Sequence, residues 1–125
     1  MSITVEIALK EAMLLDGAIG AALVDAASGL TLGTANAARS NLDLAVAAAG
    51  NTEVLRAKQR TMQLLSMDDS IEDILITLDK QYHVIRPLNT PSGKGLFLYL
   101  ALDVAKANLG LARHQLRGLA ERIEV

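Results

Sequence analysis

Two strand-length segments that are apolar at almost every position constrain the fold of this chain more than any other feature. Residues 96–102 read Leu-Phe-Leu-Tyr-Leu-Ala-Leu, and residues 18–25 read Ala-Ile-Gly-Ala-Ala-Leu-Val-Asp. A strand points its side chains alternately to the two faces of a sheet, so a strand that is apolar throughout is buried on both faces. We therefore expect both segments at the centre of one sheet.

Three further segments, 30–35, 71–78 and 82–88, have strand patterns with more polar residues. Tight turns join 30–35 to 18–25 and 82–88 to 71–78, which predicts hairpins and a mostly antiparallel sheet. Because the wholly apolar strands take the middle, segments 30–35 and 71–78 are left at the two edges.

Helical periodicity marks three other segments. Apolar residues recur every three or four positions in 4–15, and the stretch 40–67 is helical in composition throughout. Gly50 interrupts this second helix, and a helical glycine costs about 1 kcal/mol relative to alanine, so we expect a kink or a close helix contact there. A slightly irregular surface helix is the alternative. The last helix is predicted to start at Asp103 as its N-cap and to reach Ile123.

The predicted order is helix, strand, strand, helix, strand, strand, strand, helix, in a single domain over residues 1–125. This order is an α/β (α+β) fold class with a five-stranded, mostly antiparallel sheet. The interior would be built mainly of alanine and leucine, which favours tight packing over a roomy ligand cavity.

Composition excludes several classes of function. The chain has no cysteine, so disulfides and thiolate chemistry are absent. A net charge of -2 and only Phe97, Tyr82 and Tyr99 as aromatic residues argue against nucleic-acid binding. No window approaches the roughly 20 apolar residues that span a bilayer, and the first residues lack a secretory signal pattern. We expect a cytoplasmic protein without membrane insertion.

The loop Leu-Asn-Thr-Pro-Ser-Gly-Lys-Gly-Leu at 88–96 contains the Gly-Lys pair of nucleotide-binding phosphate loops. That pattern requires a glycine five positions before Gly93 and a Ser or Thr after Lys94, but Leu88 and Gly95 occupy these positions. The loop also leads into a strand, whereas a phosphate loop leads into a helix. We interpret the glycines as turn residues and predict no nucleotide site.

No other motif predicts a catalytic residue, a metal site or a cofactor. His83 and His114 lie on different elements and match no metal-ligand spacing. The acidic cluster at 68–73 lacks the central glycine of a calcium loop, and we interpret it as a solvated start of a strand.

The edge segment 71–78 carries apolar residues and has neither Lys nor Pro between Ile74 and Leu78. An unprotected apolar edge is a template for strand addition, so we predict that it pairs with the same strand of a second copy about a two-fold axis. The central helix would then meet its own mate. The alternative is an edge covered by a loop of the same chain. The predicted dimer interface comprises Leu55, Met62, Ile74, Leu75, Ile76 and Leu78.

Three segments resemble the Roadblock/LC7 family, which includes dynein light chains, lysosomal scaffold subunits and bacterial regulators of Ras-like GTPases. Residues 17–30 look like the first hairpin of that family, with its strand, Asp25 and turn glycine; residues 76–88 and 95–103 look like its later strands. The resemblance implies a homodimer with a continuous sheet. One central helix per chain would lie on one face, and the two terminal helices on the other.

The resemblance also implies a non-catalytic homodimer that binds a small Ras-like GTPase and modulates its nucleotide cycle or its recruitment. If the GTPase docks over the paired central helices, exposed contacts are expected at Arg56, Gln59, Arg60 and Gln63. A solvated helix exterior is the alternative for these residues. Two other functions stay open: a small-molecule sensor with a ligand pocket and, as the weakest of the three, a hydrolase or nucleotide-binding enzyme.

Overall fold

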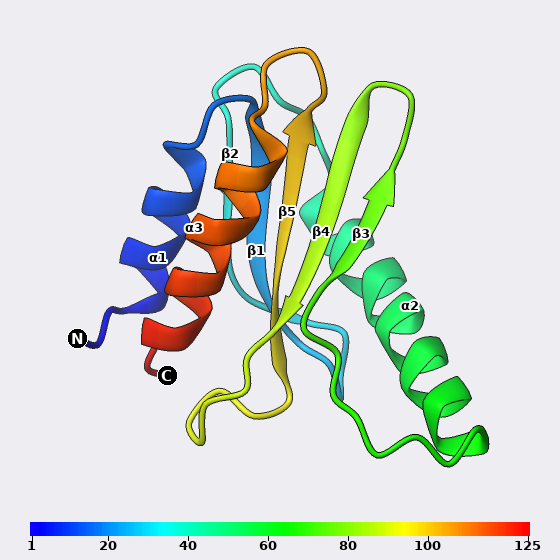
Figure 1. Cartoon of the computed structure of the whole chain (residues 1–125). Helices are drawn as coiled ribbons and strands as arrows, with labels where there is room; N and C mark the ends of the chain where they lie inside the picture. Colours follow the sequence, from blue (N-terminus) through cyan, green and yellow to red (C-terminus); the bar gives the residue numbers. More distant parts are fainter.

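The computed structural model describes all 125 residues as a five-stranded sheet with helices on both faces (Figure 1). In chain order the elements are α1 (Val5–Met13), β1 (Ala18–Asp25), β2 (Thr31–Asn36), α2 (Leu44–Leu64), β3 (Ile74–Thr77), β4 (Gln81–Pro87), β5 (Leu96–Asp103) and α3 (Leu109–Arg122). The order and the fold class agree with the prediction.

The strands are arranged in the order β2-β1-β5-β4-β3, and every neighbouring pair is antiparallel. The two wholly apolar strands, β1 and β5, lie side by side in the interior of the sheet, with Leu23 opposite Leu98. As predicted, β2 and β3 form the edges.

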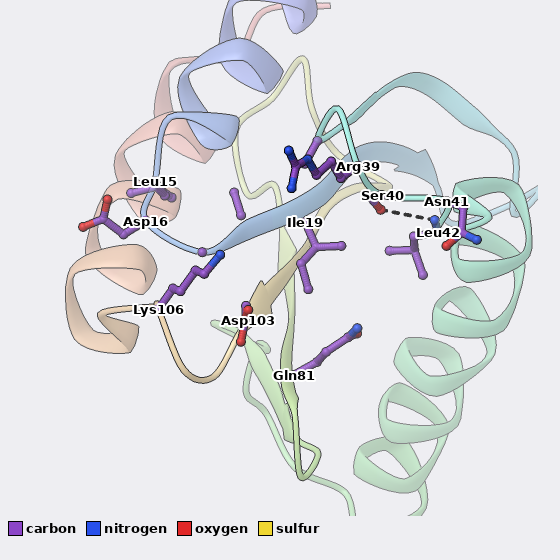
Figure 2. A pocket seen from close by; sticks show the side chains of 13 residues that line it. Leu15, Asp16, Ile19, Arg39, Ser40, Asn41, Leu42, Gln81, Asp103 and Lys106 are labelled. Carbon is purple, nitrogen blue, oxygen red and sulfur yellow. Dashed lines mark hydrogen bonds between the residues drawn. The ribbon is translucent and has the colours of Figure 1, made fainter.

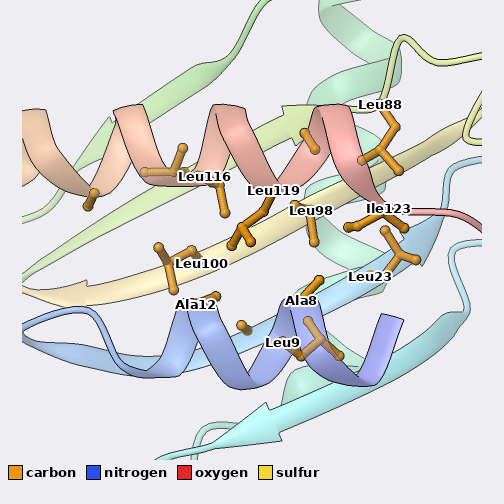
Figure 3. Packing of buried hydrophobic residues seen from close by; sticks show 14 of the residues in the cluster. Ala8, Leu9, Ala12, Leu23, Leu88, Leu98, Leu100, Leu116, Leu119 and Ile123 are labelled. Carbon is orange, nitrogen blue, oxygen red and sulfur yellow. The ribbon is translucent and has the colours of Figure 1, made fainter. Parts of the chain in front are cut away.

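The alternation of side chains along β5 divides the core into two layers. Leu98 and Leu100 point to the face covered by α1 and α3, where they pack between the two helices (Figure 3). Phe97 and Tyr99 point to the other face, which α2 covers through residues such as Leu55. We call these two sides of the sheet the α1/α3 face and the α2 face.

A parallel bridge between Ile3 and Ile123 joins the two ends of the chain. The amide of Ile3 donates to the carbonyl of Arg122 at 2.9 Å, and the amide of Glu124 donates to the carbonyl of Ile3 at 3.0 Å. Both termini therefore lie together beside α1 and α3, on the opposite side of the molecule from α2 (Figure 1).

Helix α3 begins later than predicted. Asp103 is the last residue of β5, and its carboxylate accepts the amide of Ala105 in a turn, so the predicted N-cap role of Asp103 is wrong. Asn108 caps the helix instead, because its extended backbone lets its side-chain oxygen accept the amide of Leu111. The intervening turn reverses the chain from the sheet onto the α1/α3 face.

Helix α2 is shorter than the predicted 40–67 and runs without a break. Its N-cap is Asp43, whose carboxylate accepts the amide of Val46. It passes straight through Gly50, where an added Cβ would meet no atom within 4 Å. The chain therefore provides neither the break nor the close contact that was expected at this glycine. None of the helices combines the length and the apolar character needed to cross a membrane.

Strand β3 is also shorter than the predicted 71–78. Ile71 packs against the core on the α2 face, and Asp73 forms ion pairs with arginines on other elements. Leu78 lies in the turn after the strand, where its amide donates to the carbonyl of Gln81. Only residues 74–77 remain in the ladder with β4.

Candidate functional site

The outer edge of β3 is open. The strand pairs with β4 through the register Ile74–Ile85 to Thr77–Tyr82, and no other backbone hydrogen bond involves residues 74–77. No loop of the same chain therefore forms a backbone hydrogen bond with this edge, which is what the alternative prediction of a covered edge would require. An open edge of this kind presents unpaired amides and carbonyls to a further strand.

Strand β3 is apolar on both of its faces. Ile74 packs against the core on the α2 face, and Leu75 packs against the core on the α1/α3 face. Together with Ile76 they are only half-buried in one copy of the chain. The open edge thus combines unpaired backbone groups with apolar side chains that retain exposed surface.

Helix α2 covers only part of its sheet face. Its buried residues form one stripe: Leu44, Ala48, Thr52, Leu55 and Met62. On one side of this stripe the helix lies beside the β1–β2 turn, since a Cβ on Gly29 would be 3.7 Å from the Cα of Ala49 and 3.8 Å from Oγ1 of Thr52. The rest of its circumference has no neighbour of that kind and is exposed.

A second stripe of apolar and small residues runs along this exposed part of α2. Its members recur every three or four positions and so share one helix surface, turned away from the sheet and from the β1–β2 turn. They are Val46, Gly50, Val54, Ala57, Thr61 and Leu64, and we call them the α2 stripe. An exposed apolar surface of this extent on a helix is typical of an interaction site.

The six predicted interface residues lie in three places in the structure. Ile74, Leu75 and Ile76 line the open edge. Leu55 and Met62 are 2% and 8% exposed and belong to the interior of the single chain. Their role in an interface stays a prediction, and they have little exposed surface with which to contact a second copy. The sixth residue, Leu78, lies just beyond the edge strand and is exposed.

Periodicity in the sequence places Val54, Ala57 and Leu64 of the α2 stripe beside a first apolar stripe, but it does not identify Val46, Gly50 or Thr61 as members. The helix has two apolar stripes, and the one that packs on the sheet could not be told from the other by periodicity. The signal that separates them is Gly50, which lies in the exposed stripe and has no neighbour in the chain to explain it.

The four predicted partner-facing residues are all on the exposed part of α2: Arg56, Gln59, Arg60 and Gln63. Arg56 and Arg60, four positions apart and so on the same side of the helix, form no ion pair in the chain. By contrast, each of the three arginines of α3 is ion-paired. The C-terminal half of α2 therefore presents an uncompensated positive patch next to the α2 stripe.

His83 lies on β4, one strand in from the open edge. Its Nε2 donates to Oε1 of Gln81 at 2.8 Å, and its Nδ1 accepts from the hydroxyl of Tyr99 at 3.2 Å. The neutral ring satisfies both contacts, and burial lowers the pKa of His83. Burial also raises the pKa of Tyr99 to about 12.

A cavity of about 550 Å³ lies at the end of the sheet where α1 leads into β1 (Figure 2). Ile19 and Leu42 contribute apolar surface, and the exposed cations Arg39 and Lys106 lie on its rim. Ser40 accepts the amide of Leu42 and so holds the loop that forms one wall. This is the place where a small-molecule sensor would bind its ligand.

The Gly-Lys loop at 88–96 is a turn, as predicted. A Cβ on Gly93 would lie 2.8 Å from the side chains of Leu88 and Thr90, and Gly95 has a φ of +87°, which side chains rarely adopt. Both glycines thus have a structural explanation, and the loop leads into β5 and not into a helix.

No protein-family model matches the sequence, and comparison with curated proteins found no match. Solved structures do match. The structure described as MglB with tetrameric arrangement shares 22% identity over 93% of this chain and 82% of that chain, with a TM-score of 0.78. Myxococcus xanthus MglB shares 16% identity over 93% and 88%, with a TM-score of 0.78.

A Roadblock/LC7 domain from Streptomyces avermitilis also matches, with 14% identity over 95% of this chain and 93% of that chain and a TM-score of 0.73. Identities this low show the shared architecture alone. The sequence resemblance and the structural matches agree on that architecture, and the chain has the Roadblock/LC7 fold.

Proposed function

We propose that two copies of this chain form a homodimer through β3 and α2. The observation that carries the proposal is the open apolar edge of β3, together with an uncovered apolar stripe on α2. Antiparallel pairing of β3 with its mate about a two-fold axis would satisfy the free backbone groups of both copies. It would also bury the exposed parts of Ile74, Leu75 and Ile76.

The same two-fold axis would bring the two α2 helices together. Gly50 and Ala57 leave room for the backbones to approach closely, and Val54 and Leu64 supply apolar contact area. A glycine in the middle of an exposed helix costs about 1 kcal/mol relative to alanine, and nothing inside the chain offsets that cost. A second helix packed at this point explains the glycine.

We propose further that the dimer is a non-catalytic, cytoplasmic regulator or scaffold of a small Ras-like GTPase. Support comes from the sequence resemblance, from the fold shared with MglB structures and from the unpaired cations Arg56 and Arg60. This positive patch would attract an acidic surface on the partner, with Gln59 and Gln63 as additional hydrogen-bonding groups. Residues 1–125 would act as one domain.

Affinity capture with the purified chain tests the partner. Native lysate is loaded with a non-hydrolysable GTP analogue or with GDP, and the bound proteins are identified by mass spectrometry. Retention of a small GTPase in one nucleotide state is the expected result. The captured GTPase is then purified, and its dissociation constant and hydrolysis rate are measured with the chain.

The double variant Arg56→Ala/Arg60→Ala should weaken binding of this GTPase by tenfold or more, about the effect expected of two charged contacts. Lys94→Ala is the matched control, because Lys94 is also exposed and without an ion pair but lies in the loop at 88–96. Equal binding by both variants would exclude the α2 patch as the docking surface.

A second candidate function, a small-molecule sensor, is favoured by the cavity at the end of the sheet. Its volume of about 550 Å³ is in the range of ligand pockets, and it combines apolar residues with cations. A thermal-shift screen of metabolites, repeated on Arg39→Ala/Lys106→Ala, tests it. Stabilisation by a metabolite in the wild type that is lost in the variant would establish ligand binding at this cavity.

A further inference from the structure

Hydrophobic burial alone specifies the register of β3 only weakly. The strand has four residues in its ladder, and Ile74, Leu75 and Ile76 are apolar on both faces. A slip of one residue moves every side chain to the other face of the sheet, and here it would exchange isoleucine for leucine. Another interaction must distinguish the observed register from the slipped one.

Asp73, the residue just before β3, makes that interaction. Its carboxylate accepts two hydrogen bonds from Arg113 of α3, at 2.9 Å from Nε and 2.8 Å from Nη2. The side chain of Asp73 is 8% exposed and that of Arg113 is 45% exposed, so a shielded carboxylate is held by a guanidinium that still reaches water. The hydrogen bond to Asp73 and its charge raise the pKa of Arg113.

Arg86 of β4 holds Asp73 from the sheet side. Ile74 pairs with Ile85, so extending the ladder by one residue places Asp73 opposite Arg86. Nη1 of Arg86 is 4.0 Å from the Asp73 carboxylate. Glu72 extends the cluster, because its carboxylate lies 3.7 Å from Arg86 and 3.5 Å from Arg117.

The slipped register would separate these charges. Asp73 would move to the α2 face, into the apolar surroundings where Ile74 now packs, and away from Arg113 on α3. A carboxylate buried without its partner is strongly unfavourable. The Asp73–Arg113 pair therefore distinguishes the observed register of β3 from the slipped one. Ile74 and Leu75 cannot do so, because each is apolar enough for either face of the sheet.

We propose that Arg113 and Arg86 are positioning residues: by binding Asp73 they fix the register of β3 and the face of the sheet to which each of its side chains points. They would thereby also fix the register in which a second copy of the chain adds to the edge of β3. The second of these statements rests on the proposed homodimer. The first concerns the single chain and can be tested without a dimer.

The test compares Arg113→Gln and Asp73→Asn with the control Arg122→Gln. Arg122 also lies on α3 and is ion-paired, but with Glu11 of α1 at 3.7 Å and away from β3. Amide hydrogen exchange of Leu75 and Ile76 and cross-strand nuclear Overhauser contacts between β3 and β4 report the register. Sedimentation equilibrium reports the dimer dissociation constant.

We expect Arg113→Gln and Asp73→Asn to speed exchange in β3 by about tenfold or more, since a bidentate, charge-assisted hydrogen bond is lost. The native cross-strand contacts should weaken, and the dimer dissociation constant should rise by a similar factor. The control should change neither readout. Arg113→Lys keeps the charge without the bidentate geometry and should give an intermediate effect; it also serves if Arg113→Gln fails to fold.

Unchanged exchange and unchanged cross-strand contacts in Asp73→Asn and in both Arg113 variants would overturn the inference. If the wild type sediments as a monomer at every concentration, the homodimer proposal fails. The exchange data would then still decide whether the cluster fixes β3 in the single chain.

Discussion

Ile76 of β3 lies directly opposite His83 of β4, which places a half-buried imidazole one strand away from the open edge of the sheet. The neutral ring donates to Gln81 and accepts from Tyr99. A protonated ring could donate to both partners, because the Tyr99 hydroxyl can also accept, so it is burial that favours the uncharged form.

This arrangement predicts a pH dependence of stability. Burial lowers the pKa of His83 in the folded state below the value of about 6.5 expected in the unfolded chain. The unfolded state therefore binds the proton more readily, and the unfolding free energy should fall as pH drops below about 6.5 and level off below the folded pKa. Urea unfolding between pH 7.5 and 5 measures this slope.

Other groups titrate in the same pH range, so the variant His83→Gln is needed to assign the slope. Glutamine can both donate and accept, and it does not titrate. The difference in slope between wild type and His83→Gln is the His83 contribution. No difference between them would contradict the assignment.

A charge on β3 should prevent the proposed dimer. Ile76→Asp would place an unpaired carboxylate at the two-fold interface, at a cost of several kcal/mol to association. Sedimentation should then show a monomer. Leu32→Asp is the matched control, because Leu32 is an exposed apolar residue on β2, the other edge strand. A dimer that survives Ile76→Asp would argue against assembly through this edge.

Gly50 and Gly118 offer a paired test of the α2 contact. Each is a glycine within a helix, and an added Cβ at either position would meet no atom within 4 Å in the chain. Substitution by leucine should raise helix propensity equally, by roughly 0.8 kcal/mol. Only Gly50→Leu should raise the dimer dissociation constant, by tenfold or more, about what a side chain forced between packed helices costs. If the two variants sediment alike, α2 does not pack on its mate near Gly50.

The centre of the sheet should tolerate truncation poorly. Leu98 is 1% exposed between α1 and α3, and Leu98→Ala should lower the unfolding free energy by about 2 to 5 kcal/mol. Leu14→Ala removes the same atoms from a side chain that is 82% exposed, and it should change stability by less than about 0.5 kcal/mol. Urea unfolding of both variants gives the comparison.

Element order and strand order were predictable because they depend on local patterns. Strands β1 and β5 are apolar throughout and therefore had to be central. The other three strands contain more polar residues and therefore had to be less buried. The ends of elements were less predictable. They depend on which polar side chain reaches a free amide, and both Asp103 and Asn108 were chemically suitable caps for α3.

The largest error at the candidate site concerns Asp73. Its position in an acidic stretch predicted a solvated strand start, yet its side chain is buried against Arg113. The partner lies far along the chain on a different helix, so the pair arises only when α3 packs on the sheet. Which of the two apolar stripes of α2 stays exposed could not be predicted for a related reason, since exposure depends on how α2 is rotated over the sheet.

The bridge between Ile3 and Ile123 has a practical consequence for experiments on this molecule. Because the two ends meet beside α1 and α3, a short linker could join them, and new ends could be opened between the exposed residues Pro91 and Ser92 of the loop at 88–96. Such a circular permutant would keep every strand neighbour of the sheet. Fluorophores fused at the original ends would likewise stand apart from α2 (Figure 1), so they could report association without occupying the surface under test.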